Sequence, residues 1–427
     1  MSSIAIVGAG FAGLSAAFDL AGRGHSVTLY ESGIQVGGLA AGYRHPRWDW
    51  TLDHYYHHWF TSDQDLLRLA ADLGVRDKVI IRRPVTAQFF AGRAHALDGA
   101  LPVLRFPGIP FVDRVRLGMA VAYLKLSRGW QSLENVTAED WMQRWAGRAA
   151  YQTIFRPLLL GKFGPASQQV PMSWLWARIH SRTPRLMYYE GGFQSFADAL
   201  LEAGLQRGLE LRLATPVTGI RPLPDGRLGL EADGTELAFD RVIWTGAPHQ
   251  LAAVTPDLPD AYLGGLKGLP FLSAAVAVLV LDRPFLDGVY WLSMDKRDFP
   301  FLACVEHTQF VDRAHYGGDH LLYLGDYLPQ DHPSFALSDE ALVEQWMAAL
   351  PRINPAFQPS WVKEQFVSRA VYAQPVVERG FSARLPALQT PLPGLFLASM
   401  GQVYPWDRGT NYAVEIGRRV ARLAEGR

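Results

Sequence analysis

The sequence predicts an α/β fold: a discontinuous Rossmann-type nucleotide-binding domain with an inserted α+β substrate domain and a helical segment, 101–182, that is membrane- or lid-like. Three observations predict it. A glycine-rich turn joins a short strand to a helix near the N-terminus, a strand near residue 242 follows a hairpin, and a strand, loop and helix lie near the C-terminus. A sheet assembled from such separate stretches is typical of a domain interrupted by insertions.

Composition limits the classes of protein to consider. The 427 residues are 49% apolar and 19% charged, which suits a well-packed enzyme of two or three domains. Lys plus Arg equals Asp plus Glu at 41 each, so no overall field attracts nucleic acid, and none is expected as a partner. The single cysteine, Cys304, excludes an internal disulfide and a redox-active dithiol.

Targeting signals are not apparent in the first residues. The opening MSSIAIVGAG lacks a basic region followed by a hydrophobic core, and the longest apolar stretches fall short of the ~20 residues that cross a bilayer. We therefore expect a cytoplasmic protein, or one associated with the cytoplasmic face of a membrane.

The N-terminal motif has the order strand, G-x-G-x-x-G, helix, strand, acidic residue. The strands are expected at 3–7 and 26–30, and the helix at 14–22. This order is the context in which the motif indicates a dinucleotide site. Gly8 permits the tight turn, Gly10 lets the backbone approach a pyrophosphate, and Gly13 lets the helix lie close to the sheet. Glu31 is expected to accept hydrogen bonds from the adenosine ribose, which disfavours NADP.

A second glycine-rich stretch, Gly37-Gly38-Leu39-Ala40-Ala41-Gly42, follows within a few residues of Glu31. It favours a longer dinucleotide than NAD. With this stretch, 4–42 resembles the opening of the FAD-dependent amine oxidase, phytoene desaturase and protoporphyrinogen oxidase superfamily, and is similar to that of UDP-galactopyranose mutase. The resemblance implies FAD as the cofactor. One departure is Leu39, where the family often has Arg or Asn.

Two later segments resemble the same superfamily. After Gly191-Gly192, a helix and a strand at 209–213, the resemblance implies that the backbone of Val217 contacts the adenine. A hairpin at 227–239 leads to a strand at 240–244 and to Gly246, which rejoins the nucleotide-binding sheet. The resemblance therefore implies an FAD-binding domain of 1–75, 185–250 and 385–427, with 76–184 and 251–384 as the substrate-binding domain.

The C-terminal segment is expected to cover the flavin. A strand at 394–398 is followed by a loop and by a helix capped by Thr410 or Asn411, whose N-terminus the resemblance places near the flavin pyrimidine edge. Ser399 and Met400 stand where the family has Gly-Asp, so Asp407 and Arg408 are expected to supply the polar contacts instead. The predicted cofactor-binding residues are Gly8, Gly10, Phe11, Ala12, Gly13, Glu31, Ser32, Gly37, Gly38, Leu39, Val217, Gly246, Ser399, Met400, Gly409, Thr410 and Asn411.

The stretch from Trp48 to Thr61 contains three histidines among aromatic residues. Related flavoproteins place a strand here beside the isoalloxazine ring, so Tyr55, His57 and His58 are predicted to face the flavin as catalytic residues. A metal site and a purely aromatic core are the alternatives. No metal site is predicted, because only Asp53 stands nearby as a further ligand.

Two segments are candidates for substrate or membrane contacts. Residues 101–130 combine an apolar helix with basic flanks, which is typical of an interfacial helix and equally of a pocket lid. A basic and aromatic group follows, with side chains suited to a phosphate or diphosphate or to an ordinary solvated helix: Arg156, Lys162, Trp174, Trp176, Arg178 and Arg182.

Three functions are compatible with these features. The first is an FAD-dependent oxidoreductase that exchanges hydride between flavin N5 and a small-molecule or lipid-linked substrate, hydrophobic and of an isoprenoid or glycan pathway. The second is an enzyme like UDP-galactopyranose mutase that acts on a nucleotide sugar without net redox. The third is a non-catalytic FAD-binding subunit.

Overall fold

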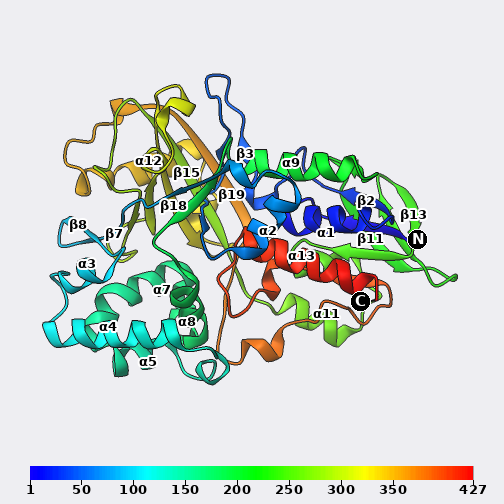
Figure 1. Cartoon of the computed structure of the whole chain (residues 1–427), viewed down its shortest axis with the longest axis horizontal. Helices are drawn as coiled ribbons and strands as arrows, with labels where there is room; N and C mark the ends of the chain where they lie inside the picture. Colours follow the sequence, from blue (N-terminus) through cyan, green and yellow to red (C-terminus); the bar gives the residue numbers. More distant parts are fainter. Residues whose placement is uncertain (427) are drawn as a thin grey trace.

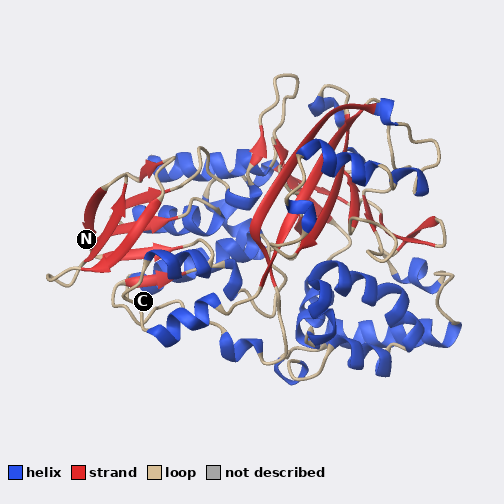
Figure 2. Ribbon diagram, turned by 180° about the vertical axis from the view of Figure 1, so that it is seen from behind, coloured by secondary structure: helices blue, strands red, loops and turns tan. Residues whose placement is uncertain are grey.

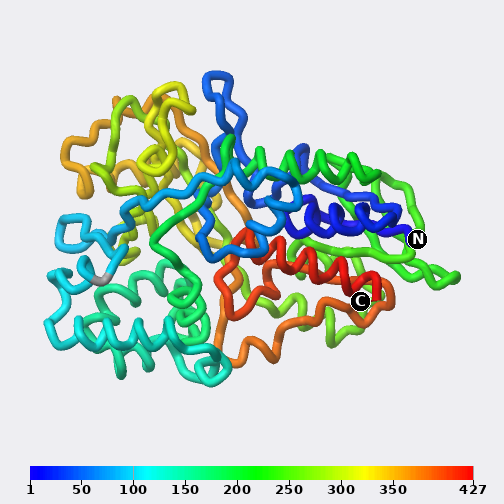
Figure 3. Tube along the Cα trace, in the orientation of Figure 1, coloured from blue at the N-terminus to red at the C-terminus, as the bar shows by residue number. Residues whose placement is uncertain are grey.

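A five-stranded parallel sheet contains strands from both the N-terminal and the C-terminal parts of the chain. In the computed structural model, which describes residues 1–426, its order is β10-β2-β1-β14-β20. The strands come from three separate stretches of the sequence: β1 (Ser3–Val7), β2 (Ser26–Tyr30), β10 (Glu210–Arg212), β14 (Arg241–Trp244) and β20 (Leu395–Leu397). Every pair in the sheet is parallel. Blue, green and red segments therefore meet at one end of the molecule (Figures 1 and 3).

Helices cover this sheet. The helices around it are α1 (Phe11–Ala21), α2 (Gln64–Asp72), α9 (Phe193–Leu205), α10 (Pro248–Val254), α11 (Asp260–Lys267) and α13 (Thr410–Ala424). The contacts of α1 with both α9 and α13 bury almost all of its residues. A small antiparallel sheet beside them consists of β11 (Val217–Pro222), β12 (Leu228–Ala232) and β13 (Thr235–Phe239). Asp233 and Gly234 adopt positive φ between β12 and β13, as the predicted hairpin requires.

A second, seven-stranded sheet forms the opposite end (Figure 2). Its order along the sheet is β19 (Val362–Pro375), β15 (Phe271–Leu281), β18 (His320–Leu328), β17 (Ala303–Glu306), β16 (Trp291–Ser293), β7 (Thr86–Phe90) and β8 (Arg93–Ala96). The central strand β15 is buried along nearly its whole length because α12 (Asp339–Met347) and neighbouring loops cover one face of the sheet. Cys304 is buried in this core.

Helices gather below the seven-stranded sheet in Figure 1. They are α3 (Ala100–Leu104), α4 (Phe111–Leu126), α5 (Ala138–Trp145), α6 (Arg148–Ala150), α7 (Arg156–Phe163) and α8 (Met172–Ser181), with a π-helical turn at Tyr151–Phe155. They share one hydrophobic core. Within the described residues, no helix combines the length and apolar character needed to cross a membrane.

Short strands connect the parts. The pair β3 (Gly42–Tyr43) and β4 (Leu52–Asp53) lies beside the group β5 (Trp59–Phe60), β9 (Leu186–Tyr189) and β6 (Val79–Arg82). The α/β fold is as predicted, but several boundaries were wrong. Helix α1 begins at Phe11 rather than Leu14, and residues 54–58 form no strand. The apolar helix expected after the segment that begins Phe106-Pro107-Gly108 is confirmed as α4, and a second, short helix, α3, precedes this segment. Proline and glycine there interrupt a continuous helix.

Candidate cofactor and substrate site

Glycines bring two turns against each other at the carboxyl end of β1. Gly8 has a φ of +101°, and a Cβ at Gly13 would lie 1.9 Å from the Gly8 carbonyl oxygen, so both positions require glycine. Gly10 caps α1 without a side-chain acceptor, which leaves the first N–H groups of α1 available to a phosphate. Gly37 and Gly38 lie directly against Gly10: a Cβ at Gly38 would be 3.1 Å from the Gly10 Cα.

Glu31 lies beside these turns at the end of β2. Its carboxylate accepts hydrogen bonds from the backbone N–H groups of Ala9 and Gly33, each at 2.8 Å, and the hydroxyl of Ser32 lies 3.2 Å away. These contacts fix the carboxylate next to the phosphate-binding turn. This position is compatible with the predicted ribose-binding role of Glu31.

Val217 and Gly246 complete this end. Val217 shares a hydrophobic cluster with Val7, Tyr30 and Trp244, at the carboxyl ends of three strands of the parallel sheet. Gly246 follows β14, where a Cβ would lie 3.0 Å from the Trp244 indole nitrogen. Sequence analysis missed Thr245, whose hydroxyl lies 2.9 Å from the carbonyl oxygens of both Val7 and Gly8 and so holds the turn. Its position directly after a strand of the nucleotide-binding sheet was the available signal.

The final helix extends past α1. Its N-cap is Gly409, which corrects the predicted Thr410 or Asn411 cap. Those two side chains bind elsewhere: the Trp59 indole N–H donates to Thr410 at 2.7 Å, and the Leu66 N–H at the start of α2 donates to Asn411 at 3.1 Å. The first N–H groups of α13 therefore have no side-chain cap.

The two helix N-termini suit a long dinucleotide. Gly417 contacts Ala12, and Arg23 pairs with Glu425, so α1 and α13 run in the same direction. Thr410 precedes Gly417 by seven residues, which puts the α13 N-terminus about 10 Å beyond that of α1. The first positive helix end would serve the pyrophosphate of FAD, and the second lies farther along, where it would suit the ring system. These residues fit FAD.

Leu39, Ser399 and Met400 lie close to these elements. Leu39 is exposed in the 3-10 turn Gly38–Ala40 beside Gly10. Ser399 is buried, and its side chain caps the 3-10 turn Met400–Gln402 by accepting from the Gly401 N–H. Met400 packs on the core that contains α1 and α13.

The predicted catalytic residues lie between β4 and β5. Tyr55, His57 and His58 are each partly exposed. Burial, with smaller contributions from Arg408, lowers the pKa of His57 to about 4; burial, then Arg182, lowers the pKa of His58 to about 3. Both imidazoles are therefore neutral at neutral pH.

The polar contacts of these residues differ. His58 Nδ1 lies 3.2 Å from the Tyr290 hydroxyl, whereas His57 Nδ1 is buried and has no hydrogen-bond partner in the described structure. Burial, with the Tyr43 charge, raises the pKa of Tyr55, so its hydroxyl stays protonated. Among residues 1–426, no group of three or more His, Cys, Asp or Glu side chains is arranged to hold a metal ion.

A cluster of basic side chains lies at the junction of the helical group with the loop before α13. Asp407 lies 2.6 Å from Lys162 and 2.5 Å from Arg178. Arg408 donates to Gln374 at 3.1 Å and to the Tyr327 hydroxyl. Sequence analysis missed Tyr327 and Gln374, which lie on β18 and β19 and carry no local motif.

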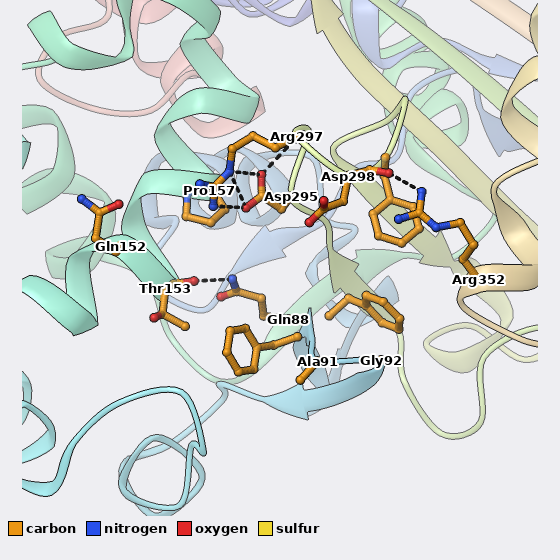
Figure 4. Close-up of a pocket in the computed structure, with 13 residues that line it drawn as sticks. Gln88, Ala91, Gly92, Gln152, Thr153, Pro157, Asp295, Arg297, Asp298 and Arg352 are labelled. Carbon is orange, nitrogen blue, oxygen red and sulfur yellow. Dashed lines mark hydrogen bonds and ion pairs between the residues drawn. The ribbon is translucent and has the colours of Figure 1, made fainter.

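A separate hollow of about 530 Å³ lies between the helical group and the seven-stranded sheet (Figure 4). Arg297 pairs with Asp295, Arg352 donates to the Asp298 backbone carbonyl, and Gln88 donates to the Thr153 carbonyl. None of the predicted cofactor residues lines it.

The parallel sheet, the paired glycine turns and the two helix N-termini define a flavin-dinucleotide-binding protein of the α/β class. Comparison with known proteins agrees. The chain belongs to the family of flavin containing amine oxidoreductases, whose model matches residues 11–424, and FAD is its cofactor.

The curated relatives either have low sequence identity to this chain or match only a short part of it. Carotenoid phi-ring synthase of Streptomyces griseus is 27% identical over 316 residues, 66% of this chain and 60% of that protein. Zeta-carotene desaturase of Capsicum annuum is 26% identical over 177 residues, 36% of this chain and 30% of the relative. L-amino-acid oxidase of Naja atra is 53% identical over 50 residues, 12% of this chain and 10% of that protein. The chain thus spans less than two thirds of the length of these relatives.

Solved structures share the whole fold. A putative protoporphyrinogen oxidase from Exiguobacterium superposes with a TM-score of 0.78 at 21% identity, covering 100% of this chain and 99% of the other. Reduced UDP-galactopyranose mutase superposes with a TM-score of 0.77 at 16% identity, covering 100% and 96%. At this identity the likeness establishes the fold alone.

Proposed function

We propose that this protein is an FAD-dependent oxidoreductase acting on a hydrophobic small molecule or a lipid-linked substrate. The observation that carries the proposal is the pair of helix N-termini about 10 Å apart along one direction. One lies at the glycine turns, and the other lies beside the segment of Tyr55, His57 and His58, where the Trp59 indole N–H donates to Thr410. The desaturase and phi-ring synthase among the relatives support a hydrophobic substrate.

Within this proposal the chain orients the reactants and controls charge. The Rossmann-type parallel sheet, with Gly10, Gly38 and Glu31, would hold the adenosine and pyrophosphate of FAD, and the α13 N-terminus would stabilise negative charge on the reduced flavin. Bound FAD supplies two-electron redox chemistry by exchanging hydride at N5. Neutral His57 and His58 keep positive charge away from the reacting carbon.

The visible spectrum of the purified protein tests this proposal. A yellow protein that releases FAD on denaturation, and whose flavin band bleaches anaerobically with an isoprenoid or carotenoid substrate, supports it. Gly13→Ala is expected to lose FAD, whereas Gly264→Ala, where a Cβ meets nothing within 4 Å, keeps it. Protein that stays colourless after incubation with FAD contradicts the proposal and favours a subunit without cofactor.

A mutase-like reaction on a nucleotide sugar is the second candidate. The basic cluster around Asp407 favours it, because a nucleotide sugar carries a diphosphate. The fold shared with UDP-galactopyranose mutase is compatible with it. Turnover of a nucleotide sugar by the reduced protein, without consumption of reducing equivalents, would establish this candidate in place of the first.

We also propose that one face of α3 and α4 contacts an anionic lipid bilayer. Leu117, Ala120 and Leu124 of α4 point into the helical core, while the opposite face exposes large apolar side chains: Leu101, Leu104, Phe111, Val112, Val115, Met119, Tyr123 and Leu126. Residues 101–128 contain five basic residues and one acidic residue, Asp113, so the surface is complementary to anionic headgroups. If α3 and α4 were a lid, this apolar face would lie against a pocket, whereas here it is exposed.

A further inference from the structure

The basic cluster carries more positive charge than its own carboxylate neutralises. Four cationic side chains meet there, Lys162 from α7, Arg178 and Arg182 from the end of α8, and Arg408 from the loop before α13. Within residues 1–426, Asp407 is the only carboxylate within 4 Å of any of them. Even if the charge of Lys162 is not counted, the cluster therefore contains three guanidinium groups and one carboxylate.

Asp407 is held ionised and is fully occupied. Burial would raise the pKa of Asp407, but Lys162 and Arg178 outweigh burial and hold this pKa well below its ordinary value. Lys162 binds both carboxylate oxygens at 2.6 Å, and Arg178 binds one of them. The single negative charge of Asp407 therefore does not neutralise Arg182 and Arg408 as well.

Arg182 and Arg408 have only neutral neighbours as partners. Arg408 donates to Gln374 and to the Tyr327 hydroxyl, and its guanidinium lies 5.2 Å from the Tyr327 ring centre. Arg182 lies 5.3 Å from the ring centre of Phe60 and has no carboxylate within 4 Å in the described residues. Aromatic faces support a cation weakly and leave its N–H donors free for an anion.

Arg182 lies beside the segment that carries the predicted catalytic residues, because the Phe60 ring that it faces packs against the His58 ring at 5.2 Å. Its side chain is exposed, yet burial, then Arg178, lowers the pKa of Arg182 to about 9. A side chain that is accessible but surrounded by protein and by other cations lines a concave site. Arg182 also contributes to the low pKa of His58, and Arg408 to that of His57, so both arginines lie near these histidines.

We infer that Arg182 and Arg408, backed by Arg178 and Lys162, bind a phosphate or diphosphate group of the substrate. This inference deepens the proposed function and rests on it, because it takes the bound molecule to be the substrate of the proposed reaction. Paired guanidinium groups match phosphate oxygens in a bidentate manner, and two unneutralised charges suit a multiply charged anion better than a single carboxylate. The hydrophobic part of the molecule would then extend past the neutral histidines.

The test measures inorganic diphosphate binding to the FAD-loaded protein at constant ionic strength. Tryptophan fluorescence is the signal, because Trp174 and Trp406 lie at the cluster. Inorganic diphosphate is expected to bind, and Arg182→Gln to weaken binding about tenfold or more, since hydrogen bonds between charged groups contribute on that scale. The matched control is Arg185→Gln, an exposed arginine three residues away. Flavin fluorescence should stay constant, because the anion does not displace FAD.

The contrary results are distinct. No binding at millimolar diphosphate, equal binding by Arg182→Gln and wild type, or release of FAD by diphosphate would each overturn the inference. Succinate binding that depends on Arg182 in the absence of diphosphate binding would replace the phosphate with a carboxylate. Farnesyl diphosphate binding more tightly than inorganic diphosphate supports a lipid-linked source, and equal affinity supports a phosphate recognised alone. If the protein lacks FAD, the same titration on the colourless protein still tests the anion site.

Discussion

Gly417 of α13 lies directly on the backbone of Ala12 in α1. A Cβ at Gly417 would lie 2.2 Å from the Ala12 carbonyl oxygen, a distance that real side chains do not reach. The two helices can approach this closely only because α13 has no side chain at that position. The contact fixes the α13 N-terminus relative to the phosphate-binding end of α1.

We predict that Gly417→Ala separates these helices. The methyl group forces α13 away from α1, so the free energy of unfolding should fall by about 1–3 kcal/mol, as for overpacked cores. FAD affinity should fall with it. Gly264→Ala in α11 is the control, because a Cβ there meets nothing within 4 Å. Equal denaturation midpoints and equal FAD retention in both variants would show that the contact is unimportant.

Asn411 is predicted to act through α2. Asn411→Ala leaves the Leu66 N–H without its acceptor, and loss of such a cap costs about 1–2 kcal/mol of unfolding free energy. Asn411→Asp keeps an acceptor and should retain most of the stability. Ser338→Ala removes a comparable cap on α12 far from the cofactor. We expect both alanine variants to be destabilised, but only Asn411→Ala to bind FAD more weakly in a flavin titration.

Asp53 is predicted to make stability depend on pH. Its carboxyl is buried against Tyr188 and Phe193, and burial raises the pKa of Asp53 from 3.8 to about 8. Between these values the folded protein keeps a proton that the unfolded chain releases, so the free energy of unfolding falls as pH rises. The slope is at most about 1.4 kcal/mol per pH unit.

Urea denaturation at several pH values checks this prediction. Asp53→Asn removes the titrating group, so its stability relative to wild type should increase from pH 5 to pH 8. The exposed Asp49→Asn is expected to follow wild type across the range. Parallel curves for wild type and Asp53→Asn would mean that Asp53 is ionised in the folded state.

The bilayer contact predicts binding to anionic vesicles. Replacing Phe111 and Met119, which are 73% and 62% exposed, by serine should reduce co-sedimentation with phosphatidylserine vesicles more than about tenfold, because each loses its apolar burial in the bilayer. Val371→Ser, at an exposed apolar position on β19, should have no effect. Wild-type protein that stays in the supernatant at every lipid composition would rule out the contact.

Local chemistry allowed the nucleotide-binding end to be predicted from sequence. Gly8, Gly13 and Glu31 each occupy a position whose role depends on neighbours within one βαβ unit, so the motif contains the needed information. The strand near residue 242 and the final helix were recognisable by resemblance to a family. Their pairing with β1 and α1 was implied, and the structure shows it.

Contacts between distant segments could not be predicted in the same way. The Thr410 and Asn411 side chains look like helix caps in sequence, but Trp59 and Leu66, more than 300 residues away, use them instead. Likewise, the sequence indicated Lys162, Arg178 and Arg182 as candidates for binding an anion. It did not indicate that Asp407 pairs with Lys162 and Arg178, because this pairing depends on how the loop before α13 packs on the helical group. Single-residue propensities carry no information on such packing.

The pairing of the first helix with the last has a consequence for biosynthesis. Helix α1 leaves the ribosome before α13. The contacts of Ala12 with Gly417 and of Arg23 with Glu425 can form only after α13 has been synthesised. At the usual speed of translation that interval is on the order of a minute or less. We therefore expect newly made chains to acquire FAD only after α13 has been synthesised, and until then the apolar face of α1 depends on transient partners for protection.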